Sequence, residues 1–286
     1  MQIFNEIKEI QEVLKVLRHD HSTIGLVPTM GALHQGHTSL IEASIAENDV
    51  TIASIFVNPT QFNNAEDLEN YPQTLDKDLA LLETQGCDFV FVPSVNEIYP
   101  EPPILTFNFG ALEKTMEGAF RPGHFNGVAL IISKLLHLIN PDVAYFGQKD
   151  LQQFKIIERL VKDTSMNIGL RMMPILREDS GLAMSSRNKR LSAAGKRVAA
   201  NIYQALLIAK EHYQLTTQTD KSIHQSQVFL GQFESLNVEY LTWVNLKDLQ
   251  PIEIGNEPEK LALCFAGYIE GIRLIDNLIV DGRKGY

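Results

Sequence analysis

Two histidines three residues apart, His34 and His37, stand in the segment PTMGALHQGHTSL at residues 28–40. Gly31 and Gly36 in the same segment permit a tight turn and a close backbone approach. His37 falls near the start of a helix expected over 38–47, where exposed N–H groups and the helix dipole favour an anion. We therefore expect the two imidazoles to hold phosphate oxygens. A solvated helix face is one alternative, and a metal site is another that lacks a third ligand at a suitable spacing.

Two further polar segments carry cationic groups suited to phosphate. In GQKDLQQ, Lys149 follows Gly147 at a predicted turn from strand to helix, so its ammonium can reach a phosphate. Asp150 beside it can cap the helix or accompany magnesium, and a surface ion pair with the lysine is the alternative. In REDSGLAMSSRN two hydroxyls and a guanidinium stand in a row and suit a polyphosphate, although short Ser/Arg runs are often flexible basic loops. These residues are Ser185, Ser186 and Arg187.

Amide side chains mark a possible site for a small polar acid. Gln61 lies in NPTQFN after an apolar run, and Gln153 lies near the start of a predicted helix. A glutamine amide both donates and accepts hydrogen bonds, so it suits a carboxylate that also carries hydroxyl groups. A lone glutamine is usually a surface residue, so the prediction depends on the positions of the two.

Alternating strands and helices position these segments. Apolar runs predict strands over 23–28, 50–58, 87–93, 142–147 and 168–176, and periodic patterns predict helices over 1–20, 38–47, 75–86, 125–140 and 150–163. Such alternation predicts an α/β fold with a Rossmann-like parallel sheet, whose ligands bind beyond the carboxyl ends of the strands. Helices over 192–213 and 220–236, a strand over 238–246 and a hairpin turning near Glu270 and Gly271 predict a smaller α+β domain. We expect domains at 1–176 and 177–286, with 177–192 as the hinge.

Composition restricts the class of protein. The 286 residues carry a formal net charge of −10, which argues against broad binding to nucleic acid or to an anionic membrane. We find no signal-peptide pattern and no apolar window of about 18 residues, so we expect a cytoplasmic protein. Cys87 and Cys264, the two cysteines, lie in apolar runs and are expected to be reduced packing residues.

Six ordered motifs carry a resemblance along the whole chain. They are PTMGALHQGHTSLI, SIFVNPTQFN, YPQTLDKDLALL, RPGHFNGV, FGQKDLQQ and LREDSGLAMSSRN. Together they resemble the pantothenate synthetase (pantoate–β-alanine ligase) family. HQGH alone is similar to the HxGH signature of the wider nucleotidylyltransferase superfamily, and MSSRN is similar to the KMSKS loop of that superfamily.

The resemblance implies a two-step reaction. Pantoate and MgATP would form pantoyl adenylate and pyrophosphate, and β-alanine would then displace AMP to give pantothenate. The second domain would close as a lid, and family members are usually homodimers. By resemblance the catalytic residues are His34, His37 and Lys149; the ATP-binding residues are Pro28, Met30, Gly31, His34, Gly36, His37, Gly147, Lys149, Asp150, Leu176, Met184, Ser185, Ser186 and Arg187; and the pantoate- or β-alanine-binding residues are Asn58, Gln61, Arg121 and Gln153.

The magnesium ligands are left open. Many family members have glutamate at the position of Gln148, and some have a further acidic residue at the position of Lys77. Asp78 and Asp150 are the first carboxylates to test. An adenylyltransferase acting on pantetheine phosphate is the competing enzyme and would not need Gln61 and Gln153. A regulatory protein that binds ATP without turnover is the second alternative, and it would be expected to have lost the histidines or the lysine that this chain retains.

Overall fold

A computed structural model describes residues 1–252 and 259–282 and divides the chain into two compact units. Unit 1 comprises Met1–Gln148 and Gln152–Pro174, and unit 2 comprises Lys149–Leu151 and Ile175–Tyr286. The short segment Lys149–Leu151 thus groups with unit 2 although both of its chain neighbours belong to unit 1. The domain boundary at 176 and 177 expected from the sequence stays a prediction.

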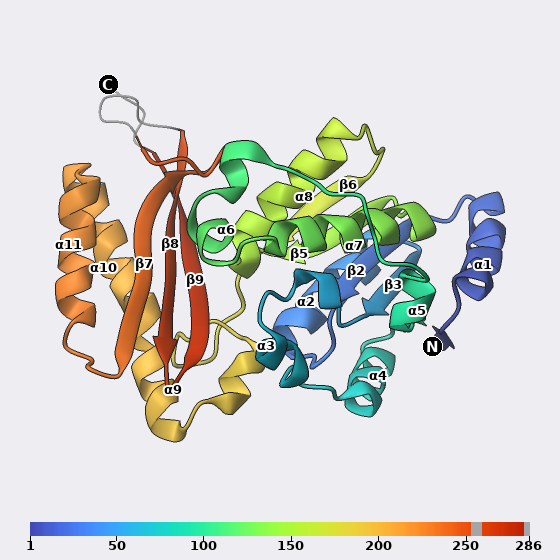
Figure 1. The fold of residues 1–286 in the computed structure, drawn as a ribbon, viewed down its shortest axis with the longest axis horizontal. Coiled ribbons are helices and arrows are strands. Elements are labelled where there is room, and N and C mark those ends of the chain that lie inside the picture. The colour runs from blue at the N-terminus through green and yellow to red at the C-terminus, as the bar shows by residue number, and fades with distance from the viewer. Residues whose placement is uncertain (253–258, 283–286) are drawn as a thin grey trace. The chain divides into compact units, whose positions relative to one another are not determined.

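Unit 1 is built of alternating strands and helices (Figure 1). The strands are β1 (Gln2–Phe4), β2 (Ile24–Thr29), β3 (Val50–Ile55), β4 (Phe89–Phe91), β5 (Val143–Gly147) and β6 (Gly169–Met173). The helices are α1 (Ile7–His19), α2 (Gln35–Glu47), α3 (Ala65–Glu69), α4 (Leu75–Thr84), α5 (Val95–Ile98), α6 (Met116–Phe120), α7 (His124–Ile139) and α8 (Leu151–Asp163), with 3₁₀ turns η1 (Pro59–Gln61), η2 (Gly110–Glu113) and η3 (Gln148–Asp150).

All six strands of unit 1 pair in parallel in the order β1-β4-β3-β2-β5-β6. The chain runs from β2 through β3 to β4 and then returns to place β5 on the other side of β2. Strands β2 and β5 therefore form the switch point of the sheet, beyond whose carboxyl ends open α/β sheets bind their ligands. The expected Rossmann-like parallel sheet is confirmed.

Strand side chains alternate between two buried faces, which is why the strands read as continuous apolar runs. On one face Ile24, Leu26 and Ile52 join the core formed with α1, α7 and α8. On the other face Val27 and Ala53 join the core formed with α2 and α4. The sheet of unit 1 is thus the middle layer between two layers of helices.

Unit 2 is a helix-covered antiparallel sheet. Its elements are the turn η4 (Ser186–Arg190), α9 (Ala193–Ala199), α10 (Asn201–Thr216), α11 (Thr219–Leu230), β7 (Leu236–Asn245), β8 (Lys260–Ile269) and β9 (Ile272–Asp281). The strands pair in the order β7-β8-β9, and one sheet face packs on α10 and α11. The predicted hairpin is confirmed: Glu270 and Gly271 join β8 to β9 with φ of 53° and 74°, as a two-residue turn of this hand requires.

Several predicted boundaries are wrong for local reasons. The helix predicted over 192–213 is two helices that meet at Ala200, and the helix predicted over 220–236 ends at Leu230. The helix predicted from residue 38 begins at Gln35, because His34 caps it. The helix predicted from Asp150 begins at Leu151, after the turn η3. Strand β1 and the short helices α3, α5 and α6 were not predicted, since each is too brief to carry a period.

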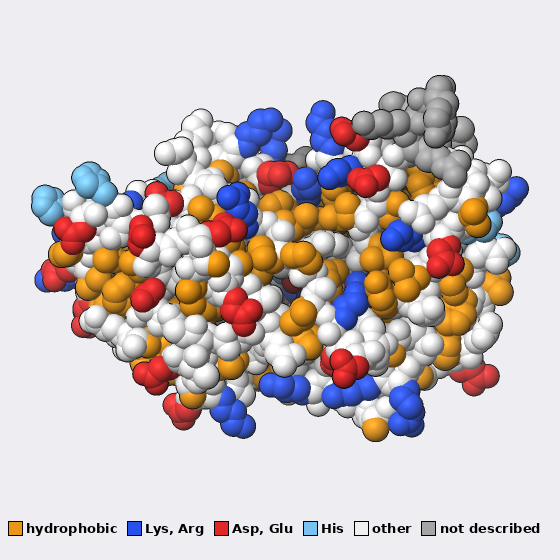
Figure 2. Space-filling view, turned by 180° about the vertical axis from the view of Figure 1, so that it is seen from behind, with side chains coloured by type: hydrophobic (Ala, Val, Ile, Leu, Met, Phe, Trp, Pro, Cys, Tyr) orange, Lys and Arg blue, Asp and Glu red, His pale blue; other side chains and the backbone are white. Residues whose placement is uncertain are grey.

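The surface carries charges of both signs. On the face drawn in Figure 2 acidic and basic side chains are interspersed among apolar ones. Within residues 1–252 and 259–282 no helix is long and apolar enough to cross a membrane.

We predict that neither thiol reacts rapidly in the native protein. Cys87 is 2% exposed and Cys264 is 5% exposed, and burial raises the pKa of the Cys87 thiol to about 11. At pH 8 about a thousandth of Cys87 is then the reactive thiolate. Titration with a chromogenic disulfide should release two equivalents only after denaturation in guanidinium. Rapid release of one equivalent from the folded protein would contradict this placement.

Candidate functional site

A buried carboxylate fixes the turn that leaves β2. Asp78 on α4 is 3% exposed and accepts the N–H groups of Ala32, at 2.9 Å, and Leu33, at 2.8 Å. Gly31 and Ala32 both have positive φ, 80° and 51°, so two successive residues take the left-handed conformation. At Gly31 a Cβ atom would lie 3.1 Å from an Asp78 oxygen, so a side chain there would be strained and crowded. The turn therefore depends on this glycine and on this carboxylate.

The turn delivers the two histidines to the first turn of α2. His34 is the N-cap residue, and its Nδ1 accepts the Gly36 N–H at 3.1 Å. The Nδ1 of His37 accepts the His34 N–H at 3.3 Å, which completes a capping box made of two imidazoles. The ring centroids lie 4.1 Å apart, and both residues are half-buried. The histidines thus satisfy backbone donors at the helix start.

This capping assigns the proton of each neutral ring. A nitrogen that accepts a backbone N–H cannot carry the proton of a neutral imidazole, so Nδ1 is the acceptor and Nε2 holds the hydrogen. In the neutral form of each ring, His34 and His37 therefore carry their hydrogen on Nε2. Two such donors at a helix N-terminus, where the dipole is positive, match the geometry of an anion site.

A second buried network fixes the amide of Gln61. Asn58 is 1% exposed, and its Nδ2 donates to Gln61 Oε1 at 3.0 Å and to the Gly127 carbonyl at 3.1 Å. The Nε2 of Gln61 donates to Met30 Sδ at 3.0 Å. Because a thioether sulfur is a weak acceptor, a carboxylate or hydroxyl oxygen can replace it at little cost. The network thus turns the side-chain amide NH2 of Gln61 toward Met30, which directly follows β2.

The amide of Asn58 is occupied within the protein. Its Oδ1 accepts from the hydroxyls of Thr60, at 2.9 Å, and Tyr99, at 3.0 Å, while both Nδ2 hydrogens are used as described above. Burial raises the pKa of the Tyr99 phenol, which keeps it a neutral donor. At Gly127 a Cβ atom would lie 2.2 Å from the Thr60 carbonyl oxygen, so α7 and η1 touch there. Asn58 consequently orients Gln61 and holds η1 on α7.

A buried histidine links Gln61 to Arg121. The Nδ1 of His124, which is 6% exposed, lies 2.8 Å from the Gln61 carbonyl, and its Nε2 lies 3.3 Å from Arg121 Nη1. A carbonyl accepts and a guanidinium donates, so His124 is neutral with its proton on Nδ1. Gln152 holds the neighbouring segment by donating to the carbonyls of Leu112 and Thr115. His124 thus positions Arg121, and Gln152 fixes the segment 112–115 that precedes it in the chain.

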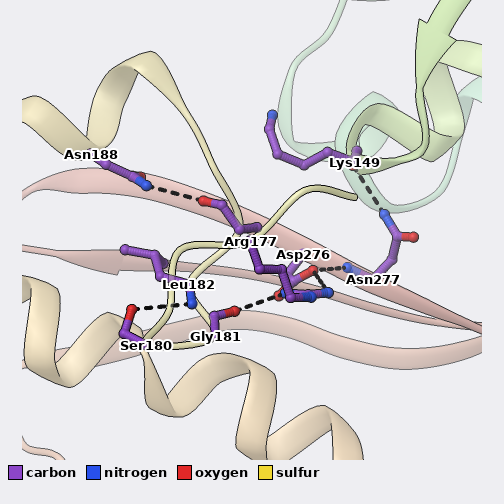
Figure 3. A network of polar contacts seen from close by, with 9 residues as sticks. Lys149, Arg177, Ser180, Gly181, Leu182, Asn188, Asp276 and Asn277 are labelled. Atoms are coloured by element: carbon purple, nitrogen blue, oxygen red, sulfur yellow. Dashed lines mark hydrogen bonds and ion pairs between the residues drawn. The ribbon is translucent and has the colours of Figure 1, made fainter. Parts of the chain in front are cut away.

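Unit 2 contains a second set of predicted residues. Lys149 Nζ lies 3.1 Å from Asp150 Oδ2 in the turn η3. The loop after Ile175 folds back on itself, with the Met184 N–H donating to the Leu176 carbonyl at 3.0 Å. Ser185 then caps η4 by accepting the Arg187 N–H. The segment predicted to be a hinge is therefore ordered by its own hydrogen bonds (Figure 3).

The predicted residues divide between the two units. Within unit 1, hydrogen bonds join Met30 to Gln61, Gln61 to Asn58, and Gln61 through His124 to Arg121. Gln153 lies half-buried in the first turn of α8. The residues in unit 1 are Pro28, Met30, Gly31, His34, Gly36, His37, Asn58, Gln61, Arg121, Gly147 and Gln153, and those in unit 2 are Lys149, Asp150, Leu176, Met184, Ser185, Ser186 and Arg187.

Sequence reasoning missed residues that orient these groups. His124 lies in the motif RPGHF. This motif counted toward the family resemblance, and no role was assigned to its histidine. Arg177, Asp276 and Asn277 were not singled out. Two adjacent polar residues in the apolar strand segment LIDNLIV were the available signal, because such a pair is buried only when it has partners.

Neither carboxylate considered as a magnesium ligand belongs to a cluster. Both oxygens of Asp78 accept backbone N–H groups, and Asp150 pairs with Lys149. Among the described residues no group of three or more His, Cys, Asp or Glu is arranged to hold a metal ion. Magnesium commonly binds through one or two carboxylates together with substrate phosphates.

Comparison with known proteins identifies the relatives of this chain. The family model described as pantoate-beta-alanine ligase matches residues 2–279. A pantothenate synthetase of Cytophaga hutchinsonii is 51% identical over 264 residues, which cover 92% of this chain and 93% of the relative. One of Phocaeicola vulgatus is 47% identical over 288 residues, covering 99% of this chain and all of the relative.

Solved structures agree with these relatives. A crystal structure of pantothenate synthetase from Thermus thermophilus has a TM-score of 0.91 at 36% identity, covering 97% of this chain and 99% of that one. A pantoate-beta-alanine ligase from Francisella tularensis, described as complexed with beta-gamma ATP and beta-alanine, has a TM-score of 0.81 at 36% identity, covering 98% and 97%.

We predict that Asp78→Asn lowers the free energy of unfolding by about 2 kcal/mol, since a buried carboxylate that accepts two N–H groups loses its charge and one acceptor. Denaturant unfolding followed by circular dichroism measures the change. Asp49→Asn is the matched control, because Asp49 accepts the Thr23 N–H at an exposed position, and it should have a smaller effect. Unchanged stability with a raised magnesium requirement would instead make Asp78 a metal ligand.

Proposed function

Since the chain belongs to the pantoate–β-alanine ligase family, we propose that it joins pantoate to β-alanine through a pantoyl-adenylate intermediate at the expense of ATP. The observation that carries the proposal is the imidazole capping pair. His34 and His37 present Nε2–H donors at the start of α2, and the Gln61 amide is oriented toward the same β2 segment through Met30. An anion site beside an acid-binding amide is what the first step requires.

In the first step a carboxylate oxygen of pantoate attacks the α-phosphorus of ATP. An O–P bond forms, the bond from the α-phosphorus to the bridging oxygen breaks, and pyrophosphate leaves with the electron pair. A carboxylate is already a nucleophile, so no general base is needed and the protein supplies alignment and charge neutralisation. The Nε2–H groups of His34 and His37 donate to phosphate oxygens, and His37 stabilises the departing pyrophosphate.

In the second step the amine of β-alanine attacks the acyl carbonyl of the adenylate. A C–N bond forms, the C–O bond to AMP breaks, and the amine loses a proton as the amide forms. Gln61 and Gln153 hold the pantoyl group by its oxygen atoms, while Asn58 keeps the Gln61 amide in place. Arg121, which lies beside His124, binds the β-alanine carboxylate through its guanidinium.

The remaining ATP contacts come from both units. From unit 1 we propose Pro28, Met30, Gly31, Gly36 and Gly147, and from unit 2 we propose Lys149, Asp150, Leu176, Met184, Ser185, Ser186 and Arg187. Lys149 and Arg187 supply positive charge, and Leu176, which is 40% exposed, supplies an apolar surface. Magnesium would arrive as the metal of MgATP, and the phosphates of the nucleotide would supply most of its ligands. A cytoplasmic homodimer stays a prediction.

The deciding experiment measures both half-reactions with purified protein and MgATP. Pantoate alone should release pyrophosphate without free AMP, and added β-alanine should then release AMP and pantothenate. With pantoate labelled by ¹⁸O in its carboxylate, one label should appear in AMP, because the carboxylate oxygen bonded to phosphorus leaves with it. AMP without label would exclude the adenylate. No pyrophosphate from folded protein that binds ATP would overturn the proposed function.

We predict that His37→Ala slows pantoate-dependent pyrophosphate release by about 100-fold or more, the size expected for losing one donor to developing charge. The thermal unfolding midpoint is measured alongside, to show that the fold persists without the cap. His19→Ala, which changes an exposed histidine, is the control and should keep full activity. Wild-type turnover by His37→Ala would remove the histidine from the reaction.

We predict that Gln153→Ala raises the KM for pantoate at least fivefold more than the KM for ATP, because a lost hydrogen bond to one substrate weakens that substrate selectively. Initial rates with each substrate varied at saturation of the other give the comparison. Gln232→Ala, at an exposed position of unit 2, is the control. Equal increases for both substrates would argue against a pantoate-specific role.

A further inference from the structure

Two adjacent buried polar residues on β9 stand out from their apolar strand. Asp276 is 4% exposed and Asn277 is 2% exposed. The main-chain N–H of Asn277 donates to Asp276 Oδ1 at 2.7 Å, so the Asp276 carboxylate also holds the main chain of its neighbour. A buried carboxylate is costly unless it is paired, and no step assigned above uses either residue. The hydrogen-bond partners of Asp276 and Asn277 therefore indicate the role of these two residues.

Asp276 is paired with the first residue of the ordered loop. Arg177 donates to both carboxylate oxygens, Nη1 to Oδ2 at 2.6 Å and Nη2 to Oδ1 at 2.9 Å, which is the bidentate arrangement (Figure 3). Burial raises the pKa of the Asp276 carboxyl, and the hydrogen bonds and charge of Arg177 oppose that shift. Arg177 also lies over the ring of Tyr203, 3.6 Å from the centroid. The guanidinium is thus held on two sides.

The loop that starts at Arg177 is fixed by further bonds. Arg177 Nη1 donates to the Gly181 carbonyl at 3.1 Å, which closes the turn. At the other end Asn188 Nδ2 donates to Glu178 Oε1 and to the Ala183 carbonyl, each at 3.0 Å. The segment 184–187 lies between these two anchors. The main chain is therefore fixed on both sides of this segment, by the Arg177–Asp276 pair on one side and by Asn188 on the other.

Asn277 holds a different segment. Its Nδ2 donates to the carbonyl of Lys149 at 3.0 Å (Figure 3). Lys149 stands 128 positions away in the chain and groups with unit 2, whereas Gln148 and Gln152 on either side belong to unit 1. This hydrogen bond is a direct tie between the lysine and the C-terminal sheet. Asn277 thus contacts the main chain of Lys149, and the neighbouring Asp276 contacts Arg177 at the start of the loop.

We propose that Arg177, Asp276 and Asn277 are positioning residues for ATP, which fix the main chain of Lys149 and of the 184–187 segment on β9. The Lys149 ammonium and the donors of that segment are then held at a constant separation before the nucleotide binds. Preorganisation of this kind lowers the cost of ordering charged side chains around phosphates. The inference rests on the proposed function, since it assumes that Lys149 and this segment bind ATP.

Asn277→Ala is the first test, because it removes the donor to Lys149 and leaves the ion pair intact. We expect the KM for ATP to rise about five- to tenfold, the effect of one lost hydrogen bond, with the KM for pantoate changed less than twofold. Asn201→Ala is the matched control, since Asn201 Nδ2 also donates to main-chain carbonyls of unit 2, at Arg197 and Val198. An unchanged KM for ATP, or an equal change with Asn201→Ala, would overturn the proposal.

A double-mutant cycle tests whether Asn277 acts through Lys149. In a Lys149→Ala background, Asn277→Ala should raise the KM for ATP by less than twofold further, because the ammonium that it positions is gone. Asn201→Ala should have the same small effect in both backgrounds. A full five- to tenfold effect of Asn277→Ala without the lysine side chain would show that Asn277 does not work through it.

Arg177→Lys tests the loop, since it keeps the charge but loses the bidentate geometry and the planar contact with Tyr203. The KM for ATP should rise at least threefold while the pantoate KM is kept. Where turnover is too slow to measure, calorimetric affinity for a non-hydrolysable ATP analogue replaces the KM and needs no reaction. If the proposed function is wrong, the wild-type protein will release no pyrophosphate when pantoate is added. The affinity of each variant for the ATP analogue still tests the positioning role in that case. Wild-type affinity in both Asn277→Ala and Arg177→Lys would refute it.

Discussion

The carboxylate of Asp78 accepts the N–H groups of Ala32 and Leu33, and the chemistry of the β2 segment follows from that contact. It holds the chain in two successive left-handed residues, so His34 arrives as the N-cap of α2. Once His34 caps the helix, its Nδ1 is committed to a backbone N–H, and so is the Nδ1 of His37. The position of one buried charge therefore determines which atoms of two histidines remain as donors.

Buried polar residues also fix the amide of Gln61, the guanidinium of Arg121 and the main chain of Lys149. Asn58 uses its own amide within the protein and thereby fixes that of Gln61, and His124 is kept neutral between a carbonyl and a guanidinium. In unit 2 the buried carboxylate of Asp276 and the amide of Asn277 play the corresponding part. In these places a buried polar side chain fixes a group that we propose to contact substrate, namely Gln61, Arg121 and Lys149. Buried polar networks whose members are all hydrogen-bonded make the local geometry rigid and unique.

The sequence predicts those elements in which apolar residues recur at helical spacing over several turns or form a long continuous run. The parallel sheet, α1, α2, α7 and the hairpin at Glu270 and Gly271 were predicted from local patterns that the tertiary structure reinforces. The position of His37 near a helix start was predicted from the same patterns, although the helix begins three residues earlier than predicted. The orienting roles of Asp78 and Asn277 were not predicted, because their partners lie far away in the chain: Asp78 is 46 positions from Ala32, and Asn277 is 128 from Lys149. Spacing within one segment carries no record of such contacts.

The most direct test of this account is the tautomer of the two histidines, measured by long-range ¹H–¹⁵N correlation in ¹⁵N-histidine-labelled protein near pH 8. Assignment uses His34→Gln and His37→Gln. The account predicts that both rings are neutral with the proton on Nε2, and that MgATP shifts the Nε2–H signals while the Nδ1 signals keep the pattern of acceptors. A proton on Nδ1 of either ring would contradict the capping box as the source of the phosphate donors.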